Sequence, residues 1–332
     1  KTIQDERYRA SALNALADKL PPELLSEALA AAKAIQDEKY RAIALITLAD
    51  KELSVLPEAL AAAKAIQDEK YRAIALTTLA NKELSVLAEA LAAAKAIQDE
   101  RYRASALTAL ANKLPPELLL EALAAARSIE SESSRAHALS ALADKLPQIL
   151  PEALAAARSI ESESSRAHAL SALADKLPQI LPEALAAARS IESESSRAHA
   201  LSALADKLPQ ILPEALAAVR AIDNVYRTNA LSALAEKLTP EFLPEALVAA
   251  KTIQYERYRS IALNALASNL SQMSNVKLFP LWQDTLHELS LRTRPNLLGD
   301  IEALFPVIFA LGGQAAMAEI ARAIVDVARW WK

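Results

Sequence analysis

The chain has 332 residues, a formal net charge of −4, 53% hydrophobic residues and only 4% aromatic residues. It contains three glycines and no cysteine. This composition leaves little room for β-turns or glycine-rich phosphate loops, excludes disulfides and thiolate metal sites, and gives no general attraction to nucleic acid or anionic lipid. No uninterrupted apolar run approaches the ~18 residues that a membrane span needs. We therefore expect a nearly all-helical, cytoplasmic protein without a membrane partner.

A tandem repeat organises most of the chain. Residues 128–158 recur without change as 159–189 and, with Val219 as the single difference, as 190–220. Diverged copies extend in both directions, with one isoleucine marking each unit at intervals of 31 or 32 residues. The marker residues are Ile3, Ile35, Ile66, Ile97, Ile129, Ile160, Ile191, Ile222 and Ile253. Self-similarity at this period is the signature of a helical repeat protein with nine units.

Each repeat unit is predicted to form two helices. In the unit marked by Ile129, Ser131 is a suitable N-cap for a first helix over residues 132–145, and Pro147 ends that helix. The second helix is expected from residue 149 or 151 to residue 160, with Pro151 in its first turn. Two such short helices cannot bury their apolar faces alone, so neighbouring units must stack. The sequence predicts an all-α, right-handed α-solenoid of nine helical hairpins of about 31 residues.

The repeat ends near Asn269, and the remaining residues differ in composition. All three glycines and all three tryptophans lie beyond this point. We predict helices over residues 276–291, 295–311 and 314–331, with Gly312 as a left-handed C-cap. Solenoids need terminal caps to cover the apolar end of the stack. The predicted domains are therefore a solenoid over residues 1–269 and capping helices over residues 270–332.

The first helix has a constant side and a variable side. At 100° per residue, Arg135, Leu139 and Leu142 share the side that hardly changes between units, and His137 lies on the opposite side, where units differ. A constant face with a variable face is typical of a scaffold that displays side chains, and neutral drift on a solvated face gives the same pattern. The candidate ligand-facing residues are Arg7, Lys39, Lys70, Arg101, Ser133, His137, Ser140, Asp144, His168, Ser171, His199, Ser202 and Asn229.

An arginine column on the constant side and a glutamate column at the start of the second helix run through the repeats. A guanidinium that faces a core needs a partner, so we predict ion pairs between the two columns. The residues assigned to these inter-helix pairs are Arg135, Glu152, Arg166, Glu183, Arg197 and Glu214. A tyrosine precedes most of the arginines, as at Tyr71 and Tyr226, and is expected to pack between units.

The residues give little support for catalysis, metal binding or nucleic-acid binding. His137, Ser140 and Asp144 recur at helical spacing, but no feature marks an oxyanion hole, so we interpret them as a polar surface. Equivalent histidines in adjacent units stand about 10 Å apart, too far to share a zinc ion. Each central unit has four acidic and three basic residues, which disfavours nucleic acid. We predict no enzyme, cofactor or metal site.

Units of the form RAxALxALAxxLP followed by EALxAARxI resemble the helical repeats of bacterial, notably cyanobacterial, STAND-type NTPases with NACHT- or NB-ARC-like switch domains. The stretch that begins Arg294-Pro-Asn-Leu-Leu and ends Arg329-Trp-Trp is similar to the C-terminus of such proteins. The resemblance implies a HEAT- or TPR-like sensor region, with NTPase and effector domains in a longer parent chain. Lys1 in place of an initiating methionine agrees with a fragment.

Two functional hypotheses follow. The first is a binding module that recognises a protein or peptide on its variable helix row and acts as the ligand-sensing region of a larger signalling NTPase. The second is a structural or engineered scaffold without a ligand of its own, because near-identical central copies are typical of recent duplication or deliberate construction. Residues upstream of Lys1 that contain a phosphate-binding loop would favour the first hypothesis, and an expression tag there would favour the second.

Overall fold

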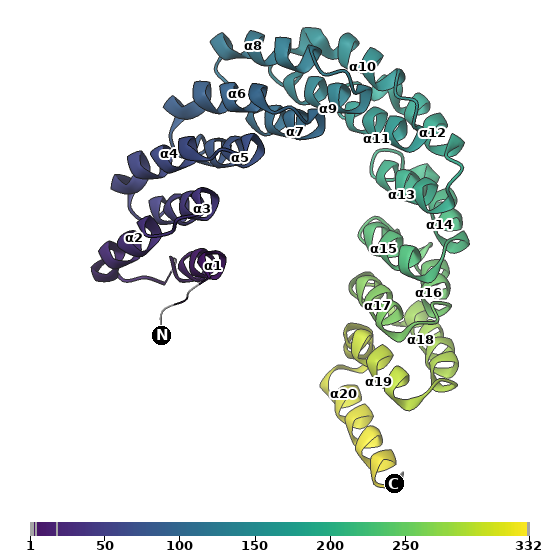
Figure 1. The fold of residues 1–332 in the computed structure, drawn as a ribbon. Helices are drawn as coiled ribbons and strands as arrows, with labels where there is room; N and C mark the ends of the chain where they lie inside the picture. The colour runs from purple at the N-terminus through teal and green to yellow at the C-terminus, as the bar shows by residue number, and fades with distance from the viewer. Residues whose placement is uncertain (1–2, 4, 18, 331–332) are drawn as a thin grey trace. The chain divides into compact units, whose positions relative to one another are not determined.

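The computed structural model describes residues 3, 5–17 and 19–330. Over these residues the chain forms twenty α-helices and no strand. The helices pack in adjacent pairs, as expected for an α-solenoid (Figure 1). Contacts divide the chain into two compact units, Lys1–Ile160 (unit 1) and Glu161–Lys332 (unit 2). The prediction of an all-α, solenoid-like fold is confirmed, and the boundary predicted at residue 269 stays a prediction.

Each helix pair consists of a first helix and a second helix, and the helices of each kind form one layer of a unit. The first helices of unit 1 are α1 (Glu6–Ala17), α3 (Glu38–Ala49), α5 (Glu69–Leu79), α7 (Glu100–Ala111) and α9 (Glu132–Leu142). Its second helices are α2 (Leu25–Lys33), α4 (Leu56–Ala65), α6 (Leu87–Ala96), α8 (Pro116–Arg127) and α10 (Leu150–Arg158). Successive first helices contact one another directly, as α7 and α9 do, so the first layer is the more closely packed one.

Unit 2 continues the same pattern. Its first helices are α11 (Glu163–Leu173), α13 (Glu194–Leu204), α15 (Asn224–Ala235) and α17 (Glu256–Ser271). The second helices that pack beside them are α12 (Leu181–Ser190), α14 (Leu212–Ala221), α16 (Leu243–Lys251) and α18 (Asn275–Ser290). Two further helices, α19 (Arg294–Ala303) and α20 (Phe305–Trp330), pack against α17.

Local sequence explains where the helices begin and end. The Ser131 hydroxyl accepts a hydrogen bond from the backbone N–H of Ser134, and Asp37 caps α3 in the same way through Tyr40. Before Pro147 the backbone leaves the α region, and residues Pro147–Ile149 form a short 3₁₀ turn that leads directly into α10. The first helix therefore stops three residues before the predicted end at residue 145, and the second helix spans Leu150–Arg158.

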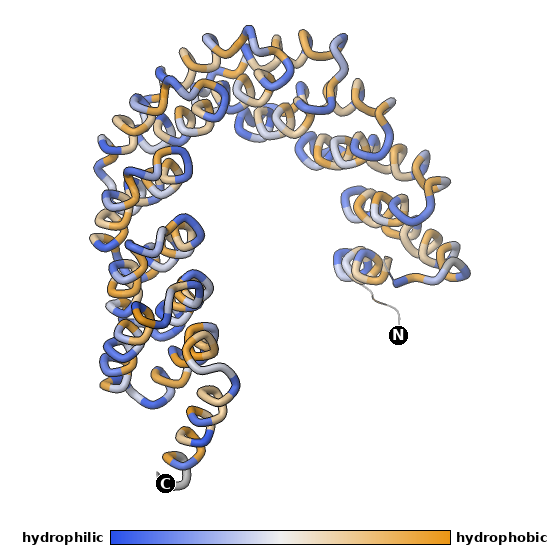
Figure 2. The backbone as a smooth tube through the Cα atoms, turned by 180° about the vertical axis from the view of Figure 1, so that it is seen from behind, coloured by the Kyte–Doolittle hydropathy of each residue, from blue (hydrophilic) through white to orange (hydrophobic). Residues whose placement is uncertain are grey.

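The core of each unit lies between the two layers and consists of alanine, leucine and isoleucine. In α9 and α10, Leu139, Leu142, Ala153 and Ala157 have exposed fractions of 0%. Alanines on the facing sides let the helices approach closely, and the buried leucines fill the remaining space. Figure 2 shows hydrophobic positions along the helices of both layers, separated by hydrophilic turns. Burial of these faces against neighbouring pairs is the main contribution to stability.

The C-terminal helices differ from the prediction in two places. The helix expected over residues 295–311 is interrupted at Leu304, between α19 and α20. The left-handed glycine is Gly313, with φ 59°, and it breaks the helical geometry inside α20, so the predicted C-cap at Gly312 is wrong by one residue. Among the described residues, Phe305–Val327 is a helix long and apolar enough to cross a membrane by length and composition. Gln314, Glu319, Arg322 and Asp326 interrupt its apolar residues, and the expectation of no membrane partner stays a prediction.

Arg135 and Arg197 pair with other groups than Glu152 and Glu214, so these two predicted ion pairs are wrong in their partners. The Nη1 atom of Arg135 donates to the carbonyls of Ile129 (2.9 Å) and Glu130 (3.2 Å), and Arg197 makes the same bonds to Ile191 (2.8 Å) and Glu192 (3.4 Å). These carbonyls belong to the turn before the arginine's own helix. Arg166 likewise donates to the Glu161 carbonyl at 3.2 Å. The guanidinium thus satisfies turn carbonyls beside the core.

The glutamate column pairs instead with the basic residue at the end of the preceding second helix. Arg127 makes a two-point contact with Glu152, at 2.7 and 2.6 Å, and Arg189 makes the same contact with Glu214, at 2.8 and 2.6 Å. The hydrogen bonds from these guanidinium groups lower the pKa of both glutamates. Glu183 occupies the same position in α12. Ion pairs between helices are present, but they join consecutive second helices.

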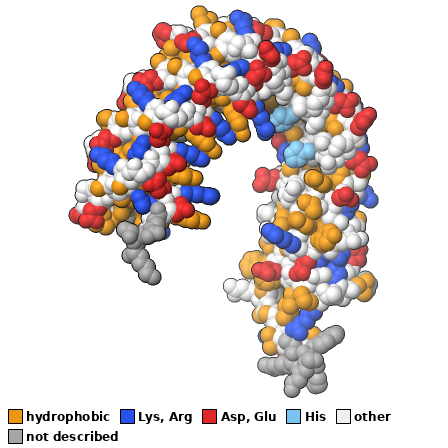
Figure 3. Space-filling model, in the orientation of Figure 1, with side chains coloured by type: hydrophobic (Ala, Val, Ile, Leu, Met, Phe, Trp, Pro, Cys, Tyr) orange, Lys and Arg blue, Asp and Glu red, His pale blue; other side chains and the backbone are white. Residues whose placement is uncertain are grey.

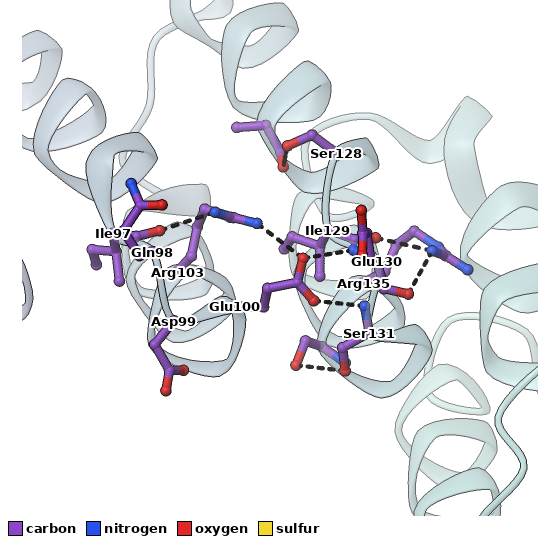
Figure 4. A network of polar contacts seen from close by, with 12 residues as sticks. Ile97, Gln98, Asp99, Glu100, Arg103, Ser128, Ile129, Glu130, Ser131 and Arg135 are labelled. Carbon is purple, nitrogen blue, oxygen red and sulfur yellow. Dashed lines mark hydrogen bonds and ion pairs between the residues drawn. The ribbon is translucent and has the colours of Figure 1, made fainter.

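A second set of glutamates, at the first position of the first helix, reaches into the next repeat. Glu100 accepts hydrogen bonds from the backbone N–H groups of Glu130 (2.8 Å) and Ser131 (2.7 Å), which precede α9 (Figure 4). Glu6 does the same for the turn before α3 through Gln36 (2.8 Å) and Asp37 (2.7 Å). These backbone bonds lower the pKa of Glu6 and Glu100. Each carboxylate therefore fixes the register between neighbouring pairs.

This contact predicts a pH dependence of stability. Since the folded-state pKa of Glu6 and Glu100 lies below the usual value of 4.5, their contribution is present above that value and is lost as pH falls through the lowered pKa. We expect Glu6→Gln/Glu100→Gln to lower the urea midpoint at pH 7 and to differ little from the parent protein once pH is below the lowered values. Circular dichroism at several pH values measures this. An equal loss at all pH values would contradict a role for the carboxylate charge.

The last arginine of the column has a different environment from the others. Arg259 and Asp300 both have exposed fractions of 0%, and Arg259 Nε lies 2.7 Å from Asp300 Oδ2. Arg259 also donates to the carbonyls of Ile253 (3.0 Å) and Gln254 (3.1 Å), and the Ser260 hydroxyl donates to Asp300 (3.2 Å). Helix α19 is thereby joined to α17 through a buried ion pair, which the repeats do not contain at the equivalent positions Arg135 and Arg197.

Candidate ligand-binding surface

The structure divides the thirteen candidate ligand-facing residues into three groups. Eight are exposed: Arg7, Arg101, Ser133, His137, Asp144, His168, His199 and Asn229. Three are half-buried: Lys39, Lys70 and Ser140. The other two, Ser171 and Ser202, have exposed fractions of only 7% and 1%. Both serines are therefore largely buried, although Ser171 lines the cavity described below.

Packing between successive first helices buries these two serines. The Ser202 hydroxyl donates to the Ala198 carbonyl of its own helix at 2.7 Å. The backbone carbonyl of Ser171 accepts a hydrogen bond from Lys207 Nζ at 2.9 Å, and that of Ser202 accepts one from Lys237 Nζ at 3.1 Å. The lysine side chain of the following repeat therefore lies against the C-terminal end of the first helix.

The aspartates in the column of Asp144 take part in the same contact. Asp175 lies 3.2 Å from Lys207 and Asp206 lies 2.8 Å from Lys237, while Asp50 pairs with Lys82 in unit 1. These pairs connect the end of one first helix with the next repeat. Asp175 is thus held by Lys207 at the end of α11.

A cavity of about 320 Å³ opens on the first-helix layer of unit 2, between α11, α13 and α15. His168, His199 and Asn229 come from successive helices and all line it. The remaining polar lining consists of Ser164, Ser171, Ser195, Ser196 and Tyr226, and alanines complete the walls. Figure 3 shows histidine side chains (pale blue) on this face of the molecule. The structure thus brings together four of the predicted ligand-facing residues, His168, Ser171, His199 and Asn229.

A change in two sequence columns creates this space. In α3 and α5 of unit 1 the positions of Ser195 and Ser196 are held by Lys39-Tyr40 and Lys70-Tyr71. Lys39 Nζ lies 3.5 Å from the ring centroid of Tyr71. Lys70 makes the same contact with Tyr102, also at 3.5 Å. These cation–π contacts occupy part of the space between successive first helices. Serine pairs in the central repeats remove both the lysine and the ring, and therefore leave the gap open.

The chemistry of the cavity in unit 2 is that of a polar hydrogen-bonding site. Imidazole, hydroxyl and amide groups provide both donors and acceptors, and no carboxylate, lysine or arginine belongs to the lining. Among the described residues, no group of three or more histidines, cysteines, aspartates and glutamates could hold a metal ion. The arrangement suits polar backbone and side-chain groups of a bound chain, with alanine surfaces for its apolar atoms.

The sequence did not point to Tyr226 as part of this surface. The tyrosines were expected to pack between units, yet Tyr226 has an exposed fraction of 59% and lines the cavity. The sequence signal for its exposure is that Ser134, Ser165 and Ser196 interrupt the tyrosine column. Tyr226 is the first tyrosine after this interruption, so no lysine from the preceding repeat covers its ring. This exposes an aromatic ring beside His199.

Comparisons with known proteins add no function. No protein-family model matches the chain, and no curated protein matches it. The crystal structure of Ton1535 from Thermococcus onnurineus NA1 is similar over 92% of each chain, with 19% sequence identity and a TM-score of 0.33. A TM-score this low carries no argument about function.

Proposed function

We propose that the chain is a non-enzymatic scaffold that binds a protein or peptide on its first-helix layer. In this proposal the nine sequence units form a right-handed α-solenoid, as repeats of this length commonly do. The chain would act in the cytoplasm as the ligand-sensing region of a longer signalling NTPase, and the resemblance of its repeat motif to STAND-type proteins supports that role. It would need no cofactor.

The cavity lined by His168, His199 and Asn229 is the observation that carries this proposal. These three residues sit in a column where the repeats differ, while the inter-repeat contacts around them are repeated from unit to unit. The Arg189–Glu214 pair and the buried alanines of α12 and α14 hold the helices in place from the other layer. Variable polar groups on a rigid, repeated frame are the arrangement expected of a display surface.

A peptide-display selection on the complete chain tests the proposal. We expect selected peptides to bind with dissociation constants in the micromolar range and to lose about ten-fold or more in affinity to His168→Ala/His199→Ala, because each substitution removes a hydrogen-bonding group from the cavity wall. Thermal stability should hardly change, since both histidines are exposed. Fluorescence anisotropy and thermal unfolding measure the two quantities.

The matched control is Gln210→Ala/Gln179→Ala, which removes two exposed polar side chains from the 3₁₀ turns of unit 2, away from the cavity. Its affinity for the selected peptides should equal that of the parent protein. A selection without enriched binders, or binders indifferent to both histidines, would favour a scaffold with no ligand of its own.

A further inference from the structure

The first-helix layer of unit 1 carries a second surface, whose chemistry differs from that of the cavity in unit 2. A cavity of about 280 Å³ lies between α5 and α7, and its lining is largely apolar. Ile74, with an exposed fraction of 52%, Tyr102 and Ala109 supply apolar walls, and Lys70 stands at the rim. Exposed isoleucine beside an apolar cavity leaves hydrophobic surface in contact with water.

Cations accompany this apolar surface along the same face. Lys39, Lys70 and Arg101 occupy equivalent positions on α3, α5 and α7. First helices that pack against one another stand about 10 Å apart, so the cations form a row with that spacing. Figure 3 shows lysine and arginine side chains (blue) projecting beside hydrophobic ones (orange) from unit 1.

Carboxylates at this end of the helices have partners on the backbone. Asp68 accepts a hydrogen bond from the backbone N–H of Tyr71, and Asp99 accepts from those of Arg101 and Tyr102. Glu100 is bound to the turn before α9. A hydrogen bond with Tyr102 raises the pKa of Lys70, which therefore stays charged at neutral pH. The cations can therefore interact with the carboxylates of a separate, anionic ligand.

We propose that unit 1 binds an acidic peptide in extended conformation, with carboxylates on the Lys39–Lys70–Arg101 row and an apolar side chain in the Ile74–Tyr102 cavity. An extended or polyproline-II chain advances about 3.1–3.3 Å per residue, so acidic residues three positions apart match the ~10 Å spacing of the cations. The inference rests on the proposed binding function and names the chemistry of its partner.

Two features favour a peptide over nucleic acid. The rings of Tyr71 and Tyr102 are covered by lysine ammonium groups at 3.5 Å, so bases cannot stack on those faces. The cavity beside Ile74 offers an apolar wall, which suits an aliphatic side chain and offers few groups to a base edge. Phosphates alone would use the cations and leave the apolar surface exposed.

The test uses the complete chain and a labelled twelve-residue peptide of four Leu-Pro-Glu triplets, which adopts polyproline II with a carboxylate about every 9 Å. We expect it to bind at least ten-fold more tightly than the same peptide with glutamine in place of glutamate. Lys39→Gln/Lys70→Gln should weaken binding at least ten-fold, and Lys39→Arg/Lys70→Arg should retain it because charge and ring contact persist.

Two further variants make the result decisive. Lys277→Gln/Arg294→Gln removes two exposed cations of unit 2 and should leave the affinity unchanged. If the lysine variant does not fold, Ile74→Glu, which places a carboxylate at a half-exposed position, should abolish binding by itself. Absence of binding, equal losses in both cation variants, or tighter binding of a twelve-nucleotide oligouridine would overturn the inference. Library peptides that bind through His168 and His199 would in those cases leave the proposed function standing.

Discussion

Arg259→Leu should destabilise unit 2 by about 3–5 kcal/mol, the largest loss expected from a single substitution. The change leaves the Asp300 carboxylate buried without its cation, in a place where both groups have exposed fractions of 0%. The helices joined by this pair, α17 and α19, should become the first part of the unit to open. Urea unfolding followed by circular dichroism, with hydrogen exchange over both helices, measures the effect.

Arg197→Leu is the matched control, because its guanidinium donates only to turn carbonyls and is half-buried. We expect a loss of about 1–2 kcal/mol there. The double variant Arg259→Leu/Asp300→Leu should recover much of the stability, since it replaces an ion pair with apolar groups. If Arg259→Leu costs no more than Arg197→Leu, the buried pair is not what fixes α19.

Leu204→Ala should cost about 2–5 kcal/mol, because this side chain of α13 has an exposed fraction of 0% and its removal leaves a cavity between layers. Stability in a repeat protein is close to a sum of nearest-neighbour terms, so the damage should be local. Hydrogen exchange should accelerate in α13 and α14 and change little in α17 and α19. A uniform increase over all of unit 2 would show that the unit unfolds as one cooperative body.

The control for this prediction is Leu291→Ala, at a leucine with an exposed fraction of 78%. It removes the same atoms from a side chain in solvent and should change stability by less than about 0.5 kcal/mol. Comparing the two variants separates the effect of losing a buried leucine side chain from the effect of the Leu→Ala substitution itself.

Much of the fold could be predicted from the sequence, since its signals are local. The N-cap at Ser131 and the stop at Pro147 are read directly from residue types, and the helices begin and end within a few residues of these signals. The 3₁₀ turn at Pro147–Ile149 shortened the first helix because proline restricts the preceding residue. Gly312 and Gly313 are adjacent, and residue type alone does not decide which of them adopts positive φ.

The partners of the charged columns could not be predicted in the same way. Glu152 and Arg135 are constant in their columns, and the column of Arg127 always holds arginine or lysine. The repeat period therefore offers every glutamate two candidate cationic partners. Only the packing of consecutive second helices shows that Glu152 faces the end of the preceding one. The burial of Ser171 and Ser202 could not be predicted for a related reason, because it depends on how successive first helices pack.

One part of the candidate site could be predicted from the sequence, and another part could not. The variable column correctly selected His168, His199 and Asn229 as exposed groups. The cavity that joins them arises from what is missing, since Ser195 and Ser196 replace a lysine and a tyrosine. Absence of a side chain creates space only when the neighbouring helices stay at the same separation, and that separation is set by the repeated core.

Hydrogen exchange of the complete chain with and without a selected peptide tests the central claim most directly. If the first-helix layer is the binding surface, bound peptide should slow exchange in α11, α13 and α15, around His168, His199 and Asn229. The second helices α12 and α14 should exchange as before. Protection confined to the second helices, or no protection at a saturating peptide concentration, would contradict the account.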